Sequence, residues 1–380
     1  MRPPPVVDGS LPVAGEGSGY RPGWLRKVTR GALEGLEYLS PRPGTVKEVS
    51  TPAVGPQGTM KAWVYDRYGA PEVLELREVP LPPFRDDHEV LVRVAASSVN
   101  PVDRHMLKPP FIFRRGQGFL RPKMGRTGSD LAGRIVVVGK SVQGLHVGDE
   151  VFGVGRGALA EYAVADETQV VLKPAGLTFE QAAAVAIAAV TALQGLRDRA
   201  GVRPGQRVLI NGASGGVGTF AVQIAKSLGA QISCVCSPRN VDWVKSLGVD
   251  RVFDYTQEDF TKGGQRYDVI FDTQLNHSLA AYRRVLHPHG LLLAVGAGPG
   301  SASRIVGRLL KTIVEARIMG PRTKFFVASV KKGELETLKE LLEAGKVTPT
   351  IDRRFPFDQV PDAFRYLAEG HARGKIVVTM

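Results

Sequence analysis

The residues with the clearest chemical meaning are the glycines of the segment 208–218, VLINGASGGVG. They follow a short apolar run and precede an amphipathic stretch, 219–228, which predicts a helix. Glycines in such a turn let the backbone approach a pyrophosphate, and the free N–H groups at the helix start favour negative charge. We therefore expect a dinucleotide here; the alternative is a plain glycine loop, because the spacing is not a strict GxGxxG. The turn residues expected at the cofactor are Ser214, Gly215, Gly216, Val217 and Gly218.

The strand expected at 231–236 indicates which dinucleotide fits. An NAD site usually carries an acidic residue there, about 20 residues after the first glycine. Residues 230–241 contain no Asp or Glu, but they contain Ser237 and Arg239. Because a guanidinium makes bidentate, charge-assisted bonds to phosphate, these residues predict NADPH rather than NADH. The alternative is that Arg239 is a solvated loop cation.

Length and composition set the broad class. The 380 residues are enough for two domains, and 43% hydrophobic with 23% charged residues is ordinary for a soluble protein. No apolar run is long enough to cross a membrane, and the net charge of +13 comes with no nucleic-acid motif. The only cysteines, Cys234 and Cys236, share one face of a strand and are expected in the core. We expect a cytoplasmic protein with neither a nucleic-acid partner nor an integral membrane segment.

Composition and periodicity divide the chain into three parts. Residues 1–59 contain nine prolines and ten glycines, which predicts a largely irregular extension. Short strands bounded by turn residues follow from Met60, which indicates a small antiparallel barrel or sandwich. An Ala-rich helix is expected over 179–200, and strands then alternate with helices, as in a parallel doubly wound sheet. Near the end we expect a strand at 325–327, a candidate dimer edge, and a last strand, Lys375–Thr379, that pairs with the β-rich half.

Several motifs in this order resemble the medium-chain dehydrogenase/reductase superfamily over roughly residues 60–380. The similarity is greatest to its zinc-free quinone oxidoreductase branch, of the reticulon-4-interacting protein type. It implies an α/β protein with a GroES-like catalytic domain (60–180 and 345–380) and a Rossmann NADPH-binding domain (181–344). The motifs are Tyr68–Leu74, Asn100–Asp103, Gly128–Gly133, Val147–Gly153, Asn211–Gly218 and Gly370–Lys375.

The chain departs from the zinc alcohol dehydrogenases of that superfamily at the metal site. Those enzymes carry a Cys near the position of Asn100 and Gly-His-Glu where this chain has Gly128-Ser129-Asp130. Because neutral Asn and Ser do not replace thiolate and imidazole at a catalytic zinc, no metal is expected. What remains is hydride transfer from a nicotinamide to an activated acceptor, a quinone or an α,β-unsaturated carbonyl.

The resemblance also implies site residues beyond the glycine turn. Asn100 and Tyr68 are expected to contact the nicotinamide or the substrate carbonyl; the alternative is that each satisfies local backbone groups. Tyr255 has an alternative as a packing residue, and His371 and Arg373 as a solvated turn. The further residues expected at the cofactor are Tyr255, Val295, Gly296, Ala297, His371, Ala372 and Arg373.

Two other functions stay open at this point. One is an NAD(P)-dependent alcohol dehydrogenase or carbonyl reductase, which would depend on a metal. The other is a protein that binds the cofactor without turnover and acts through partners. A homodimer is a further possibility that the sequence leaves open.

Overall fold

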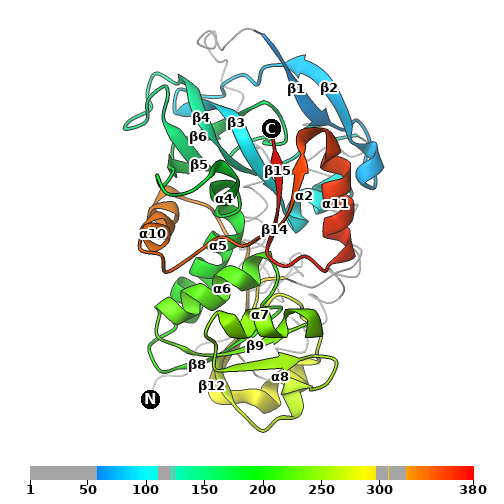
Figure 1. Cartoon of the computed structure of the whole chain (residues 1–380), viewed down its shortest axis with the longest axis vertical. Coiled ribbons are helices and arrows are strands. Elements are labelled where there is room, and N and C mark those ends of the chain that lie inside the picture. The colour runs from blue at the N-terminus through cyan, green and yellow to red at the C-terminus, as the bar shows by residue number, and fades with distance from the viewer. Residues whose placement is uncertain (1–57, 110–120, 123–124, 297–306, 308–321) are drawn as a thin grey trace, which may run out of the picture.

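The structure is a computed structural model that describes residues 58–109, 121–122, 125–296, 307 and 322–380. The irregular extension expected at 1–59 therefore lies outside the described residues except for its last two positions, and so does Ala297. Figure 1 shows two sheets arranged along the long axis of the molecule, with α5 and α6 between them.

One sheet is parallel, and among the described residues it has six strands in the order β10-β9-β8-β11-β12-β13. Numbered along the chain this order is 3-2-1-4-5-6, the arrangement of a dinucleotide-binding fold. The strands are β8 (Arg207–Asn211), β9 (Gln231–Cys236), β10 (Arg251–Asp254), β11 (Tyr267–Asp272), β12 (Leu286–Ala294) and β13 (Arg322–Phe325). The connecting helices are α6 (Gly216–Ser227), α7 (Val241–Ser246) and α8 (Leu279–Val285), with short turns η4 (Pro238–Asn240) and η5 (Phe260–Lys262).

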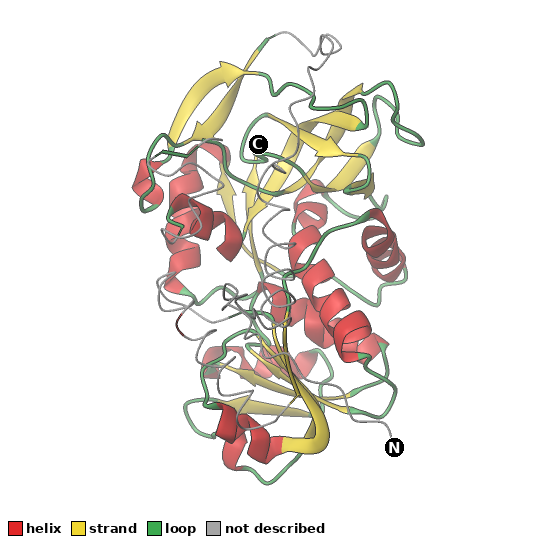
Figure 2. Ribbon diagram, turned by 180° about the vertical axis from the view of Figure 1, so that it is seen from behind, coloured by secondary structure: helices red, strands yellow, loops and turns green. Residues whose placement is uncertain are grey.

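Helices cover both faces of this sheet, as Figure 2 also shows. Successive side chains of a strand point to opposite faces. Val208 and Ile210 of β8 accordingly belong to the same buried cluster as Phe220 of α6. Leu209 belongs to a second cluster, with Tyr282 of α8. The doubly wound prediction is thus confirmed by the packing of β8.

The second sheet is β-rich, and its described strands follow the order β14-β15-β3-β4-β5-β7, with β6 paired to β3. Those of the strands expected between residues 60 and 172 that lie in this sheet pair antiparallel, as predicted, and the one parallel pair among its described strands is β14 with β15, where β14 had not been expected. The strands are β3 (Glu89–Val99), β4 (Asp130–Val138), β5 (Glu150–Val154), β6 (Tyr162–Asp166), β7 (Val170–Leu172), β14 (Ile351–Pro356) and β15 (Lys375–Thr379).

The remaining elements surround these sheets. A separate hairpin pairs β1 with β2. The last strand, β15, pairs with β3 and so returns to the β-rich half, as predicted. The elements are β1 (Thr59–Val64), β2 (Glu75–Pro80), α2 (Pro101–Leu107), α4 (Phe179–Ala183), α5 (Ala186–Leu193), α10 (Lys332–Glu343), α11 (Val360–Glu369) and the turns η1 (Pro71–Val73), η3 (Gln194–Ala200) and η6 (Phe357–Gln359).

Two expected elements differ from the structure. The helix expected over 179–200 is interrupted: α4 ends at Ala183, α5 begins at Ala186, and 194–200 form a π-helical turn. Because of this break, α5 has its own N-terminus, and a backbone N–H there donates to a carboxylate that is distant in the sequence, as described below. The strand expected at 325–327 lies earlier, at Arg322–Phe325, where it pairs in parallel with β12 at the end of the sheet.

Candidate functional site

The glycine turn follows β8 at the point where the strand order reverses. Dinucleotides bind at such a switch point, beyond the carboxyl ends of the strands. Gly212 has φ +86°, a left-handed conformation that favours glycine. A Cβ on Gly218 would lie 2.1 Å from the carbonyl oxygen of Gly212. These two glycines are therefore required by the turn itself.

A third glycine, Gly215, leaves room for a ligand. A Cβ on Gly215 would meet nothing closer than 3.5 Å. Gly215 is also the N-cap residue of α6, and because it is a glycine it provides no side-chain hydrogen bond to the start of the helix. The first N–H groups of a helix lack intrahelical acceptors, and an anion can accept from them. The turn thus fits a pyrophosphate by both space and hydrogen bonding.

A loop from the C-terminal end of the chain, 370–374, lies against this turn. The Gly374 N–H donates to the Ser214 carbonyl over 2.9 Å. The Arg239 guanidinium donates to the His371 carbonyl. The structure therefore brings predicted residues from distant parts of the chain together near the ends of β8 and β9.

Arg373 of the same loop contacts the nucleotide-binding half through an aromatic ring. Its guanidinium carbon lies 5.6 Å from the ring centroid of Trp243 in α7. This is a cation–π distance. Arg373 and Arg239 are both exposed, so they add positive charge at the surface where the sequence predicts a phosphate.

The remaining predicted cofactor residues lie at strand ends. The Tyr255 N–H donates to the Cys236 carbonyl over 3.3 Å, next to Ser237, and Tyr255 is 56% exposed. The Val295 N–H donates to the Asp272 carbonyl over 2.9 Å. A Cβ on Gly296 would lie 2.5 Å from the Thr273 carbonyl oxygen. Ala372 packs half-buried against the core of the β-rich half.

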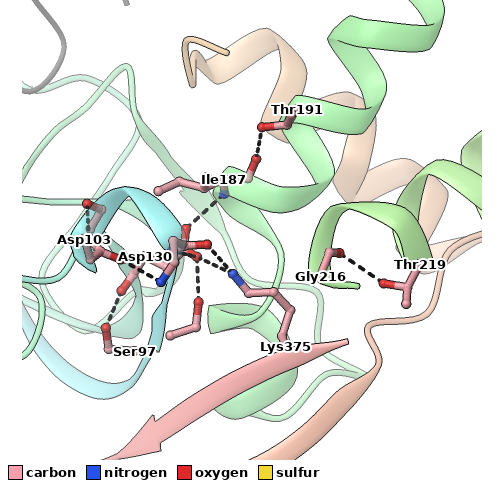
Figure 3. Close-up of polar contacts among 11 residues, drawn as sticks. Ser97, Asp103, Asp130, Ile187, Thr191, Gly216, Thr219 and Lys375 are labelled. Atoms are coloured by element: carbon pink, nitrogen blue, oxygen red, sulfur yellow. Dashed lines mark hydrogen bonds and ion pairs between the residues drawn. The ribbon is translucent and has the colours of Figure 1, made fainter. Parts of the chain in front are cut away.

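A fully buried carboxylate, Asp130 at the start of β4, lies at the centre of the polar cluster in Figure 3. Its Oδ2 accepts from Ser98 Oγ (2.6 Å) and from Asn100 Nδ2 (2.9 Å). Its Oδ1 accepts from the Ile187 N–H (2.9 Å), in the first turn of α5. The positive end of a helix dipole stabilises such a carboxylate. The interruption before α5 is what exposes this N–H to Asp130.

Lys375 at the start of β15 provides the countercharge. Its side chain is 3% exposed, and Nζ lies 3.1 Å from Asp130 Oδ2 and 2.5 Å from Asn100 Oδ1. Because an ammonium only donates, the Asn100 oxygen must face Lys375 and the amide nitrogen must face Asp130. The predicted site residue Asn100 thus has both ends of its amide engaged.

The Lys375 stem connects this cluster to the glycine turn. A Cβ on Gly216 would lie 3.1 Å from Lys375 Cδ. Figure 3 shows Lys375 extending from β15 to Asp130, with Gly216 and Thr219 of α6 beside it. The side chain of Lys375, which carries the buried ion pair, therefore packs against the first residue of α6.

A second buried carboxyl, Asp103 in α2, belongs to the same region. Its Oδ1 accepts from Ser129 Oγ, and its Oδ2 accepts from the Asn100 N–H, both over 2.8 Å. Burial, more than any other cause, raises the pKa of Asp103 to about 6. The charge of Asp130 acts in the same direction, whereas the Ser129 hydrogen bond and Lys375 oppose it.

The other predicted catalytic residue, Tyr68, lies in a neighbouring cluster. It packs half-buried against the apolar group that includes Trp63 and Leu107. Burial first, and then the charges of Tyr68 and Asp103, raise the pKa of Tyr65 to about 12. Tyr68 and Asp103 are therefore both near Tyr65.

The sequence prediction missed the residues that hold this cluster together: Asp103, Ser129, Asp130 and Lys375. A usable signal existed, because Asp130 and Lys375 each begin a strand that is otherwise largely apolar. A charge in such a position is rarely buried without a partner. Which two charges pair could not be read from the chain, since 245 positions separate them.

The donors of this cluster do not fit zinc. Within the described ranges, no three His, Cys, Asp or Glu residues gather at one point. Asn100 and Asp130 already bind the Lys375 ammonium, and Ser129 bonds Asp103. Zinc in proteins takes thiolate, imidazole and carboxylate ligands, so an amide, a hydroxyl and a paired carboxylate are a poor set.

We predict that Lys375→Met destabilises the protein by about 3–5 kcal/mol, because it leaves the Asp130 charge buried and unpaired. Urea unfolding measures the change. The double variant Asp130→Asn/Lys375→Met removes both charges and should recover part of the loss. A Lys375→Met protein within about 1 kcal/mol of the wild type would contradict the assigned pairing.

Comparisons with known proteins agree with this geometry. A family model described as the alcohol dehydrogenase GroES-like domain matches residues 86–175, and one described as zinc-binding dehydrogenase matches residues 247–378. No described helix is long and apolar enough to span a membrane.

Individual relatives cover most of the chain. The 2-methylene-furan-3-one reductase of Solanum lycopersicum is 35% identical, over 84% of this chain and 79% of that protein. The mitochondrial NAD(P)H oxidoreductase RTN4IP1 of Mus musculus is also 35% identical, over 84% and 89%. The quinone oxidoreductase of Coxiella burnetii superposes with a TM-score of 0.74 at 28% identity, over 85% of this chain and all of that one. The chain therefore belongs to the medium-chain dehydrogenase/reductase superfamily, in its quinone oxidoreductase branch.

Proposed function

We propose that this protein is an NADPH-dependent, zinc-independent reductase of quinones or α,β-unsaturated carbonyls. The observation that carries the proposal is the uncapped start of α6 at the switch point, backed by the buried Lys375–Asp130 pair. When bound there, the cofactor supplies a hydride. The names of the relatives, a furanone reductase and a quinone oxidoreductase, support this substrate class.

The donors described around Asn100 and Asp130 are a poor ligand set for zinc, which favours a reaction that needs no metal. In the zinc enzymes of this superfamily, a Lewis acid stabilises the alkoxide during oxidation of a simple alcohol. A quinone or an enone does not need one, because its conjugated carbonyl takes up the charge. The engaged amide of Asn100 keeps one hydrogen that neither Asp130 nor Lys375 uses. We propose that Asn100 and Tyr68 orient the substrate carbonyl by such hydrogen bonds.

The two sheets support separate domains for catalysis and for cofactor binding. We propose a catalytic domain of residues 60–180 and 345–380 and a cofactor domain of residues 181–344. In the cofactor domain, the glycine turn holds the pyrophosphate, Tyr255 lies along the adenosine, and Val295 and Gly296 approach the nicotinamide. Ala297 would continue that segment.

The preference for NADPH is a separate proposal. We infer that Ser237 and Arg239 bind the 2′-phosphate, with His371, Ala372 and Arg373 completing the site from the catalytic domain. The contact between Arg239 and the His371 carbonyl supports a shared site. The cytoplasmic location and the homodimer expected from the sequence stay predictions, since the relatives include a mitochondrial protein.

NADPH oxidation tests the reaction. We expect the full chain to consume NADPH with members of a quinone and enone panel, at rates that a chelator leaves unchanged. Chelator-sensitive turnover of alcohols or ketones would favour the alcohol dehydrogenase or carbonyl reductase. NADPH binding without turnover of any acceptor would favour a cofactor-binding protein.

Arg239→Ala tests the choice of cofactor. Loss of a charge-assisted contact of about 1.5–3 kcal/mol should weaken NADPH binding roughly 10- to 100-fold and leave NADH binding nearly unchanged. Titration of both cofactors by fluorescence measures this. Arg77→Ala, an exposed arginine on the β1–β2 hairpin, is the matched control. Equal losses for NADPH and NADH would refute the 2′-phosphate contact.

A further inference from the structure

Asp103 is a buried titratable group that has no role in the reaction as proposed above. It is 3% exposed and, in the part of the chain that the structure describes, forms no ion pair. One of its oxygens has a structural task, because Oδ2 accepts the Asn100 N–H in the first turn of α2. The other oxygen, Oδ1, faces only the hydroxyl of Ser129 among the hydrogen bonds of this cluster.

Ser129 is the more exposed member of this pair. It is half-buried, whereas Asp103 is buried. It is also the residue directly before Asp130, whose carboxylate binds the Lys375 side chain that packs against Gly216. The Ser129 hydroxyl therefore belongs to the backbone segment that carries Asp130, and its own hydrogen-bond partner is Asp103. A hydroxyl can accept a proton on one side while it donates one on the other.

We propose that Ser129 donates the proton that the reduced substrate takes up, and that Asp103 supplies it through Ser129. The proposal rests on the proposed reductase function. After the substrate accepts a hydride, its oxygen carries a negative charge. The Ser129 O–H bond breaks as an O–H bond forms on that oxygen, and the Asp103 carboxyl proton moves to Ser129 Oγ. Solvent then reprotonates Asp103, so one hydride and one proton are consumed in each cycle.

The charges around Asp103 are consistent with this role. A pKa of about 6 keeps a fraction of its carboxyl protonated near neutral pH. Asp130 of β4 favours the protonated form, and Lys375 of β15 favours the ionised form. Tyr65, directly after β1, also faces it, and its own pKa is raised to about 12, so it is neutral in this range. The neighbouring groups on α2 itself are Arg104 and His105, and burial lowers the pKa of His105.

Variants of the full chain test the proton path. Asp103→Asn retains an oxygen for the Asn100 N–H, and Ser129→Thr retains the hydroxyl that Ser129→Ala removes. We expect Asp103→Asn and Ser129→Ala to lower kcat about 100-fold with 1,4-benzoquinone or an enone, as for loss of a general acid. The wild-type decline of kcat above about pH 6 should disappear in Asp103→Asn, and Ser129→Thr should recover most of the rate. Asp66→Asn, an exposed carboxylate on the surface, is the matched control.

A measurement without turnover separates this proposal from the proposed function. Infrared difference spectra of the unliganded protein should show a carboxyl that titrates near pH 6 and is missing in Asp103→Asn. NADPH titration should give the same affinity for all these variants. A carboxyl that stays ionised at pH 4.5, or Ser129→Ala protein with unchanged kcat and pH profile, overturns the proton path. Failure of the wild type to reduce any acceptor refutes the reductase instead, and the titration is still measurable.

Discussion

The buried ion pair between Lys375 and Asp130 is the constraint on which this structure depends. Two charges removed from water are stable together only when their geometry is good and their remaining hydrogen bonds are satisfied. Asp130 meets that condition with four donors, and the ammonium of Lys375 with two acceptors. Those donors and acceptors come from β3, β15, the residue before α2 and the start of α5. Satisfying one carboxylate therefore fixes the relative positions of segments from both halves of the chain.

The last strand, β15, begins with this lysine and connects the two halves of the structure. β15 pairs with β3 in the β-rich half, while Gly374, just before it, donates to Ser214 in the glycine turn. Gly374 has φ +93°, and a Cβ there would lie 2.3 Å from the Thr350 carbonyl oxygen. The backbone thus approaches closely on both sides of this residue. An error in the register of β15 would disturb the ion pair and the cofactor turn together.

Sequence patterns predicted the elements that depend on neighbouring residues of the chain. They failed for features that depend on contacts between residues far apart in the sequence. The strand 231–236 and the last strand, Lys375–Thr379, agree with the structure because a short apolar run is a local signal. The Ala-rich segment 179–200 reads locally as one helix, but α5 begins anew where its N–H meets Asp130. β14, Ile351–Pro356, was not predicted, because its sequence IDRRFP has two adjacent arginines and a proline and is partly exposed at the edge of the sheet. For the site, the glycine turn was predicted, whereas the pairing across 245 positions has no local signature.

The charge balance of this cluster bears on the substrate class. Lys375 is positive, but Asp130 neutralises it, so the pair presents little net charge to a bound substrate. Asn100 and Ser129 add only neutral donors. Negative charge that develops on a substrate oxygen must then be spread by conjugation within the substrate and removed by a proton. A quinone or an enone meets the first requirement, and a hydroxyl backed by a buried carboxyl with a pKa of about 6 meets the second. An isolated ketone does not meet the first requirement, so neutral donors of this kind suit a conjugated acceptor better.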